Sequence, residues 1–193
     1  MKKRRIGLFG GTFDPIHNLH IEVVEACINQ QNLDEVWFML DKIPRHKQPL
    51  ASYADRLAML EIALKDKKGL IWQQKTDGMH ELLTLISLQQ QNPNSEFYII
   101  TGLDVILNIE QWANYRDFFG FCGFVVIRRP GSDLSQFEEL KNRLLGFGFK
   151  YEIIDFSPSI VSSSSIRSSK NFYKNSDLPK DVAKYIIDKK LYT

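Results

Sequence analysis

The chain has 193 residues, of which 44% are hydrophobic and 25% charged, a composition typical of one globular domain. Its formal net charge of +2 at pH 7 is too close to neutral to indicate binding of nucleic acid or membranes through overall charge. The two cysteines, Cys27 and Cys122, exclude a disulfide framework and a cysteine-rich zinc site, and they favour a reducing cytoplasm.

No stretch of the sequence is apolar for long enough to span a membrane. The longest strongly apolar uncharged run, 118–127, has ten residues, whereas a span needs about 20. Residues 1–5 are basic like the start of a signal peptide, but residues 6–13 then include three glycines, followed by Asp14. We interpret the basic residues as a solubilising end before a first strand; the alternative is a short arm for nucleic acid.

Short apolar runs alternate with longer amphipathic stretches along the chain. Six runs are typical of buried strands, at 5–9, 36–40, 70–72, 97–100, 124–127 and 151–154. Helical patterns begin at Ile21 and cover four further stretches, at 54–64, 82–88, 134–145 and 179–187. This alternation predicts an α/β fold with a Rossmann-like, doubly wound parallel sheet and helices on both faces. Because such sheets bind ligands outside the carboxyl ends of their strands, we expect the informative residues just after strands.

The first predicted strand ends in residues that suit an anion site. Gly10 and Gly11 let backbone N–H groups approach a phosphate without obstruction by a Cβ atom. His17 and His20 follow, and a spacing of three on a helix puts both imidazoles on one face, near helix N–H groups. The alternatives are a tight turn for the glycines, and a metal site or a surface accident for the histidines.

Several further motifs carry a resemblance to a known family. Beside Gly-Gly-Thr-Phe-Asp-Pro-x-His-x-x-His at 10–20, they are Ile-Pro-Arg-His-Lys at 43–47, Ala-Asp-Arg-Leu-Ala-Met-Leu at 54–60, Gly-Leu-Asp at 102–104 with Trp112, Arg-Pro-Gly at 129–131, and Val-Ser-Ser-Ser-Ser-Ile-Arg at 161–167. From Ile6 to about Arg167, the sequence resembles the nucleotidyltransferase superfamily and, within it, the bacterial nicotinate-mononucleotide adenylyltransferases.

The resemblance implies transfer of AMP from ATP to nicotinate mononucleotide, which gives deamido-NAD and pyrophosphate in NAD biosynthesis. It implies one nucleotidyltransferase domain over 1–193, with a small C-terminal helical part from about 160. ATP and a pyridine mononucleotide are the implied partners, with no nucleic acid and no membrane, for a monomer or a homo-oligomer. Mg²⁺ is the implied counter-ion, held mainly by the ATP phosphates and water rather than by a carboxylate cage.

The family's ATP site implies two groups of residues in this sequence. His17 and His20 would be catalytic, with His20 acting on the transition state. The ATP-binding residues would be those of the first turn, of the fourth strand exit and of the serine-rich motif: Gly10, Gly11, Thr12, Phe13, Gly102, Asp104, Ser164, Ser165 and Arg167. For the serines at 162–165, the alternative is a flexible linker.

The family's acceptor site implies five more residues, which are His46, Lys47, Thr84, Trp112 and Arg129. The two residues at 46–47 would contact a phosphate, and Trp112 would stack on the pyridine ring. The alternatives are a solvated basic loop for the first two and a core position for the tryptophan.

Two stretches depart from the family pattern. The glycine of His-x-Gly-His is Leu19 here, so the nucleotide shifts, the leucine forms an apolar wall of the adenine pocket, or activity is impaired. Residues 79–83 lack the polar Ser-Tyr-Thr set that many members carry near the pyridine carboxylate. Three alternatives therefore stay open: nicotinamide mononucleotide as the acceptor, a nucleotide-binding pseudoenzyme or regulator, and a nucleic-acid-binding protein that uses Lys2–Arg5 and Lys42–Lys47.

Overall fold

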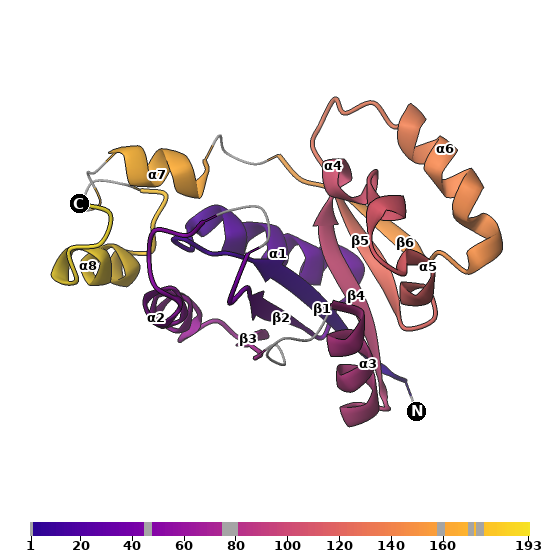
Figure 1. Cartoon of the computed structure of the whole chain (residues 1–193), viewed down its shortest axis with the longest axis horizontal. Helices are drawn as coiled ribbons and strands as arrows, with labels where there is room; N and C mark the ends of the chain where they lie inside the picture. Colours follow the sequence, from indigo (N-terminus) through magenta and orange to yellow (C-terminus); the bar gives the residue numbers. More distant parts are fainter. Residues whose placement is uncertain (1, 45–47, 75–80, 158–160, 170–171, 173–175) are drawn as a thin grey trace.

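A computed structural model describes residues 2–44, 48–74, 81–157, 161–169, 172 and 176–193. A sheet of six strands, all parallel and in the order β3-β2-β1-β4-β5-β6, forms the centre of the molecule (Figure 1). The strands are β1 (Arg4–Gly11), β2 (Glu35–Leu40), β3 (Leu70–Trp72), β4 (Ser95–Gly102), β5 (Cys122–Arg128) and β6 (Tyr151–Asp155). All six predicted strands are confirmed, most of them one to three residues longer than the apolar runs because their ends are polar or glycine.

The helices follow the strands as the doubly wound fold requires. They are α1 (Asn18–Gln31), α2 (Tyr53–Leu64), α3 (Glu81–Gln91), α4 (Leu103–Ile106), α5 (Tyr115–Phe118), α6 (Ser135–Leu144), α7 (Ser163–Ser169) and α8 (Lys180–Asp188), with 3₁₀ turns η1 (Ile109–Gln111) and η2 (Leu145–Phe147). The sequence patterns missed α4, η1 and α5, because elements of three or four residues are too short to show a helical period.

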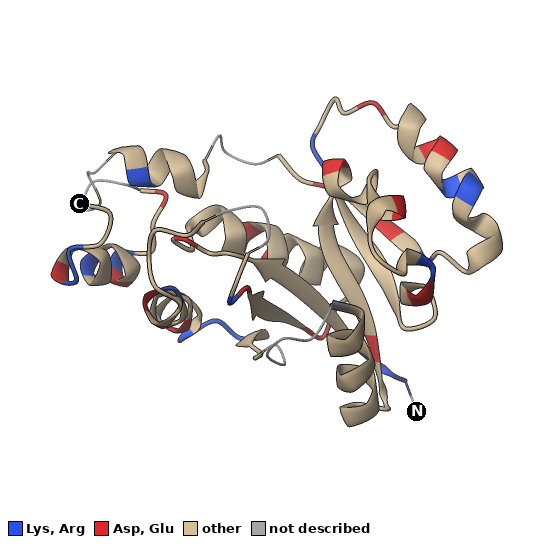
Figure 2. Cartoon of the chain, in the orientation of Figure 1, with Lys and Arg blue, Asp and Glu red and all other residues tan. Residues whose placement is uncertain are grey.

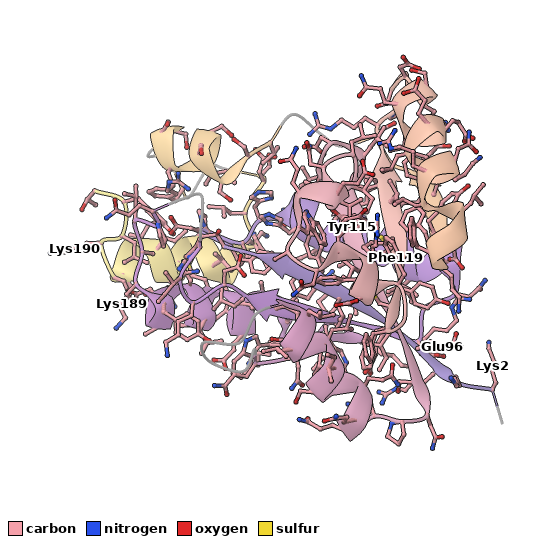
Figure 3. All side chains as sticks on the ribbon, turned by 45° about the vertical axis from the view of Figure 1, so that its right-hand side comes forward. Lys2, Glu96, Tyr115, Phe119, Lys189 and Lys190 are labelled. Atoms are coloured by element: carbon pink, nitrogen blue, oxygen red, sulfur yellow. The ribbon has the colours of Figure 1, made fainter. Side chains whose placement is uncertain are left out.

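Two apolar cores lie on opposite faces of the sheet. One core packs α1, α2, α7 and α8 against side chains such as Phe38 and Val125. The other packs α3, α4, α5 and α6 against side chains such as Trp37 and Phe124. Neighbouring residues of one strand thus belong to different cores, which confirms the prediction of helices on both faces. Figure 3 shows Tyr115 and Phe119 beside α5, far from Lys189 and Lys190 at the end of α8.

The strand order reverses between β1 and β4, and this point positions the site. The chain moves outward from β1 through β2 to β3, then returns to pair β4 with the other side of β1. The carboxyl ends of β1 and β4 therefore lie side by side, with α1 and α4 starting just beyond them (Figure 1). A ligand bound there meets the first turns of two helices.

The basic start of the chain is folded into ion pairs. Arg4 pairs with Glu35, and Arg5 pairs with Glu152 at 2.7 Å while its guanidinium lies 4.5 Å from the centre of the Tyr98 ring. Across the described residues, Figure 2 shows lysines and arginines interspersed with acidic residues along α6 and α8 rather than gathered on one face. No helix in the described ranges is both long and apolar enough to cross a membrane.

Candidate active site

A cavity of about 1000 Å³ opens at the carboxyl ends of β1, β4 and β5. Its volume lies at the upper end of small-molecule sites, which is suitable for a ligand as large as a dinucleotide. Most of the predicted site residues line it, namely Gly10, Gly11, Thr12, Phe13, His17, His20, Gly102, Asp104, Arg129, Ser164 and Arg167. Segments more than 150 residues apart in the sequence thus meet at one cavity.

The turn after β1 is shaped by close contacts of Phe13. A Cβ atom on Gly11 would lie 2.8 Å from the Phe13 ring, so a larger residue would displace the ring. Phe13 itself is buried and has φ of 46°, in the left-handed region that few non-glycine residues adopt. The ring packs 5.5 Å from the Phe38 ring, a contact that holds the backbone in this conformation.

The two histidines form a stacked pair at the start of α1. His17 is the N-cap residue and His20 the third helical residue, so their rings stack with centroids 3.6 Å apart. The backbone N–H of His17 donates to Nδ1 of His20 at 3.2 Å. In the neutral ring this bond places the proton on Nε2, the atom that can donate to a phosphate oxygen.

Burial sets the charge of His17. The residue is 3% exposed, and desolvation lowers the pKa of its imidazole to about 4. His17 is therefore neutral at physiological pH, and stacking it on His20 adds no charge repulsion to the pair. Its Nδ1 atom has no hydrogen-bond partner among the described residues, so a bound ligand or water could satisfy it.

Arg167 of α7 reaches the cavity beside the first turn. Its Nη1 donates to the backbone carbonyl of Asp14 at 2.5 Å, and its Nη2 donates to Oγ of Ser164 at 3.3 Å. A guanidinium has five N–H donors, and these two bonds use two of them. The backbone carbonyl of Asp14 fixes one side of the guanidinium, and its remaining N–H groups are suited to binding an anion.

Ser162, which lines the cavity, and Ser165 cap the start of α7. The backbone N–H of Ser165 donates to Oγ of Ser162 at 3.1 Å, and the N–H of Ser162 donates to Oγ of Ser165 at 3.0 Å. These reciprocal bonds start a helix where the alternative interpretation placed a flexible linker. Ser165 is not among the lining residues, so its contact with ATP stays a prediction.

The exit of β4 brings Asp104 to the cavity. A Cβ atom on Gly102 would lie 2.5 Å from Oδ1 of Asp104, so a larger residue would displace this carboxylate at the first turn of α4. Asp104 is exposed and lines the cavity, where its carboxylate can accept hydrogen bonds from ribose hydroxyls.

The predicted acceptor residues are less well gathered. Arg129 is exposed and lines the cavity just after β5. Thr84 is buried on α3, and Trp112 packs edge-on against Phe118 with ring centroids 5.7 Å apart; neither is among the residues that line the cavity. His46, Lys47 and residues 79–80 of the divergent stretch 79–83 lie outside the described residues. The acceptor assignments therefore stay predictions.

Leu19 is one of the apolar residues that line the cavity. It is half-buried in the first turn of α1, and Val23 lies one helical turn further on the same face. Other apolar residues come from β5 and the segments after β4 and β6, namely Leu103, Leu107, Ile127, Phe156 and Val161. Of the three possibilities, an apolar wall is the one that this placement favours.

Sequence reasoning assigned no role to two buried charged residues, Asp14, which lines the cavity, and Arg56. Both are at least 96% buried. Arg56 donates to the backbone carbonyls of Thr12 and Asp41, each at 2.8 Å, and so ties together the segments that follow β1 and β2. The signal for Arg56 was an arginine inside the apolar pattern of a helix, because a buried guanidinium requires several acceptors.

Comparison with known proteins agrees with this fold. The family model described as cytidylyltransferase-like matches residues 8–169. A solved structure titled as nicotinic acid mononucleotide adenylyltransferase from Plasmodium falciparum in complex with NaAD superposes with a TM-score of 0.75 at 22% identity, covering 98% of this chain and 97% of that one. The fold and the matched family define a nucleotidyltransferase.

Curated relatives narrow the class. The chain is 32% identical to the nicotinate-nucleotide adenylyltransferase of Bacillus subtilis over 98% of both chains, and 32% identical to a probable enzyme of the same name from Shewanella woodyi over 97% of this chain and 99% of that one. The chain belongs to the nicotinate-nucleotide adenylyltransferases of the cytidylyltransferase-like family.

Proposed function

We propose that this enzyme transfers the adenylyl group of ATP to nicotinate mononucleotide. A phosphate oxygen of the mononucleotide forms a new bond to the α-phosphorus of ATP. The bond from that phosphorus to the bridging oxygen of the β-phosphate breaks, and pyrophosphate leaves with the electron pair. Deamido-NAD is the other product.

The observation that carries this proposal is the meeting of His17, His20 and Arg167 around one large cavity at the switch point of the sheet. The attacking phosphate is already anionic, so the reaction needs no serine or cysteine nucleophile. It needs two polyanions to be held in line and the charge at the α-phosphorus to be neutralised. Imidazole, guanidinium and backbone N–H groups supply those interactions.

Each group has a separate task in this proposal. Nε2 of His20 donates to the α-phosphate in the transition state, while neutral His17 holds the His20 ring by stacking. Arg167 and Ser164 hold the β- and γ-phosphates, and the backbone at Gly10–Phe13 lies against the triphosphate. Asp104 accepts from a ribose hydroxyl. His46, Lys47, Thr84, Trp112 and Arg129 remain our candidates for the acceptor side.

Mg²⁺ fits this site as a companion of ATP. The described part of the chain contains no cluster of three or more histidine, cysteine or acidic residues that could hold a metal by itself. A hard cation that keeps most of its waters binds through phosphate oxygens, and it would supply charge neutralisation at the triphosphate.

The proposal extends to the organisation of the chain. We expect residues 1–193 to act as one nucleotidyltransferase domain in which the segment from about 160 completes the ATP site. Cys27 and Cys122 are both buried free thiols, as is usual in a reducing compartment, and this usage supports the proposal of a cytoplasmic location.

A panel of acceptors tests the proposal. Purified protein is incubated with ATP and Mg²⁺ and with nicotinate mononucleotide, nicotinamide mononucleotide or phosphopantetheine, and pyrophosphate release is measured. We expect the highest kcat/KM with nicotinate mononucleotide. Faster turnover of nicotinamide mononucleotide would move the acceptor assignment. A folded protein inert with all three, yet active as Leu19→Gly, would favour the pseudoenzyme.

A further inference from the structure

The C-terminal segment is hydrogen-bonded to the turn that follows β1, which contains Asp14 and Pro15. Ser163 Oγ donates to the carbonyl of Pro15 at 3.0 Å, and the backbone N–H of Asn18 donates to the carbonyl of Asp177 at 2.7 Å. At the end of the chain, the hydroxyl of Tyr192 donates to Oδ1 of Asp14 at 2.8 Å. Tyr192 thus bonds to the turn that follows β1, 178 residues earlier in the sequence.

Asp14 is a negative charge beside a cavity that is suited to anions. Its carboxylate is 4% exposed and accepts two backbone N–H bonds, from Leu50 at 2.8 Å and from Ala51 at 3.1 Å. Tyr192 supplies the third bond. Arg167 forms a loose ion pair with this carboxylate, 3.7 Å from Oδ2, while its Nη1 donates to the backbone carbonyl of Asp14.

The end of the chain adopts an uncommon backbone to make this contact. After α8, Lys190 and Tyr192 have φ of 52° and 63°, in the left-handed region that is unfavourable for residues with a side chain. Figure 3 shows Lys190 at the outer end of α8, where the chain turns back. Tyr192 is half-buried, its ring lies 6.1 Å from the Phe172 ring, and its pKa is raised by burial and by the bond to Asp14.

We propose that Tyr192 is a positioning residue for Arg167. By donating to Oδ1 of Asp14, its hydroxyl offsets part of the carboxylate's attraction for the Arg167 guanidinium and keeps their ion pair loose. The guanidinium then remains directed to the β- and γ-phosphates of ATP. Without the hydroxyl, Oδ1 loses a donor, the buried carboxylate attracts the guanidinium into a close ion pair, and the phosphates lose a ligand. This inference rests on the proposed role of Arg167 in ATP binding.

Tyr192→Phe tests the inference because it removes only the hydroxyl. Calorimetric titration of the full chain should give a Kd for ATP raised about tenfold, on the scale of one hydrogen bond to a charged group, and a Kd for AMP within about twofold of the wild type. Tyr185→Phe is the matched control. Tyr185 lies on α8 and donates to Asp55 at 3.0 Å, outside the cavity, so the Kd for ATP should not change.

A second substitution separates positioning from folding. In an Arg167→Lys background, Tyr192→Phe should add little to the Kd for ATP, since the guanidinium it positions is gone. Equal weakening of ATP and AMP, or an unchanged effect in the Arg167→Lys background, would overturn the inference. If Tyr192→Phe melts near the assay temperature, Tyr192→His is used in its place, because it keeps a ring and an N–H donor. A selective loss of ATP binding by Tyr192→His would also contradict the inference.

The titrations need no turnover. A wild type that releases no pyrophosphate would refute the proposed function, while the comparison of ATP with AMP would still decide whether Tyr192 acts through Arg167. Conversely, an active wild type whose Tyr192→Phe variant binds ATP normally would leave the proposed function standing and remove the inference.

Discussion

At the scale of single residues, the hydrogen bond from the His17 backbone to Nδ1 of His20 decides which imidazole atom can donate to a phosphate. His20→Ala removes that donor, and we expect kcat to fall about 100-fold or more, with a smaller change in KM for ATP. Initial rates at saturating acceptor measure both. His20→Gln, which keeps an N–H near the position of Nε2, should retain more activity than the alanine variant. A folded His20→Ala enzyme within a few-fold of wild-type kcat would exclude His20 from the mechanism.

The lowered pKa of His17 makes the free energy of unfolding depend on pH. Its folded pKa of about 4 lies below the ordinary value of 6.5, so between these values the unfolded chain binds a proton that the folded protein excludes. Stability is therefore lost as pH falls through this window, by about 2 kcal/mol between pH 7.5 and 5 from this group alone.

Urea unfolding at the two pH values measures the contribution of His17. His17→Asn keeps a good N-cap residue but does not titrate, so its free energy of unfolding should fall less on acidification than that of the wild type. An equal fall in both proteins would show that His17 is not buried as a neutral group.

At the scale of elements, the first turn of α1 carries both histidines and places Leu19 between them. If Leu19 is an apolar wall for the nucleotide, Leu19→Gly and Leu19→Ala should both raise KM for ATP several-fold. Only the glycine variant should also lose up to about 1 kcal/mol of stability through its poor helix propensity. Rate measurements and melting curves separate the two effects. A lower KM for Leu19→Gly would instead mark the leucine as an obstruction.

The elements themselves differ in how well the sequence predicted them. The long periodic helices and the apolar strands were recognisable because burial on one face, or on both, leaves a pattern. The 103–118 region was not, because its short helices follow the shape of the core around Phe118 rather than a repeat. For Ser162 and Ser165 the sequence left a flexible linker as the alternative, and their reciprocal bonds decide for a helix cap.

At the scale of the molecule, Arg56 connects the segments after β1 and β2 beneath the cavity. Arg56→Met would leave buried carbonyls without donors, so we expect a loss of about 3 kcal/mol in the free energy of unfolding. Activity should also fall, because the turn after β1 is no longer held in place through the carbonyl of Thr12. Arg143→Met is the control, because the Arg143–Glu110 pair at 2.8 Å is exposed and should contribute less than about 1 kcal/mol. Similar losses in the two variants, measured by urea unfolding, would contradict this role.

The sequence by itself determined the local features of this protein. Alternating strands and helices, glycines at strand exits, and histidines three apart follow from short-range periodicity and spacing, and they predicted the α/β fold and the anion-binding turn. The family motifs added candidate residues, of which Gly102, Asp104 and Arg167 line the same cavity as the histidines.

The tertiary structure decided what depends on contacts between distant segments. The pairing of β4 with β1 brings Gly102 and Gly10 to the same cavity, and the return of the C-terminal segment puts Tyr192 against Asp14. It also places Trp112 against Phe118 rather than in the cavity lining. Local pattern carries no information on strand order or on which buried charge meets which donor. Those choices are made by packing and by the cost of leaving a buried polar group unpaired.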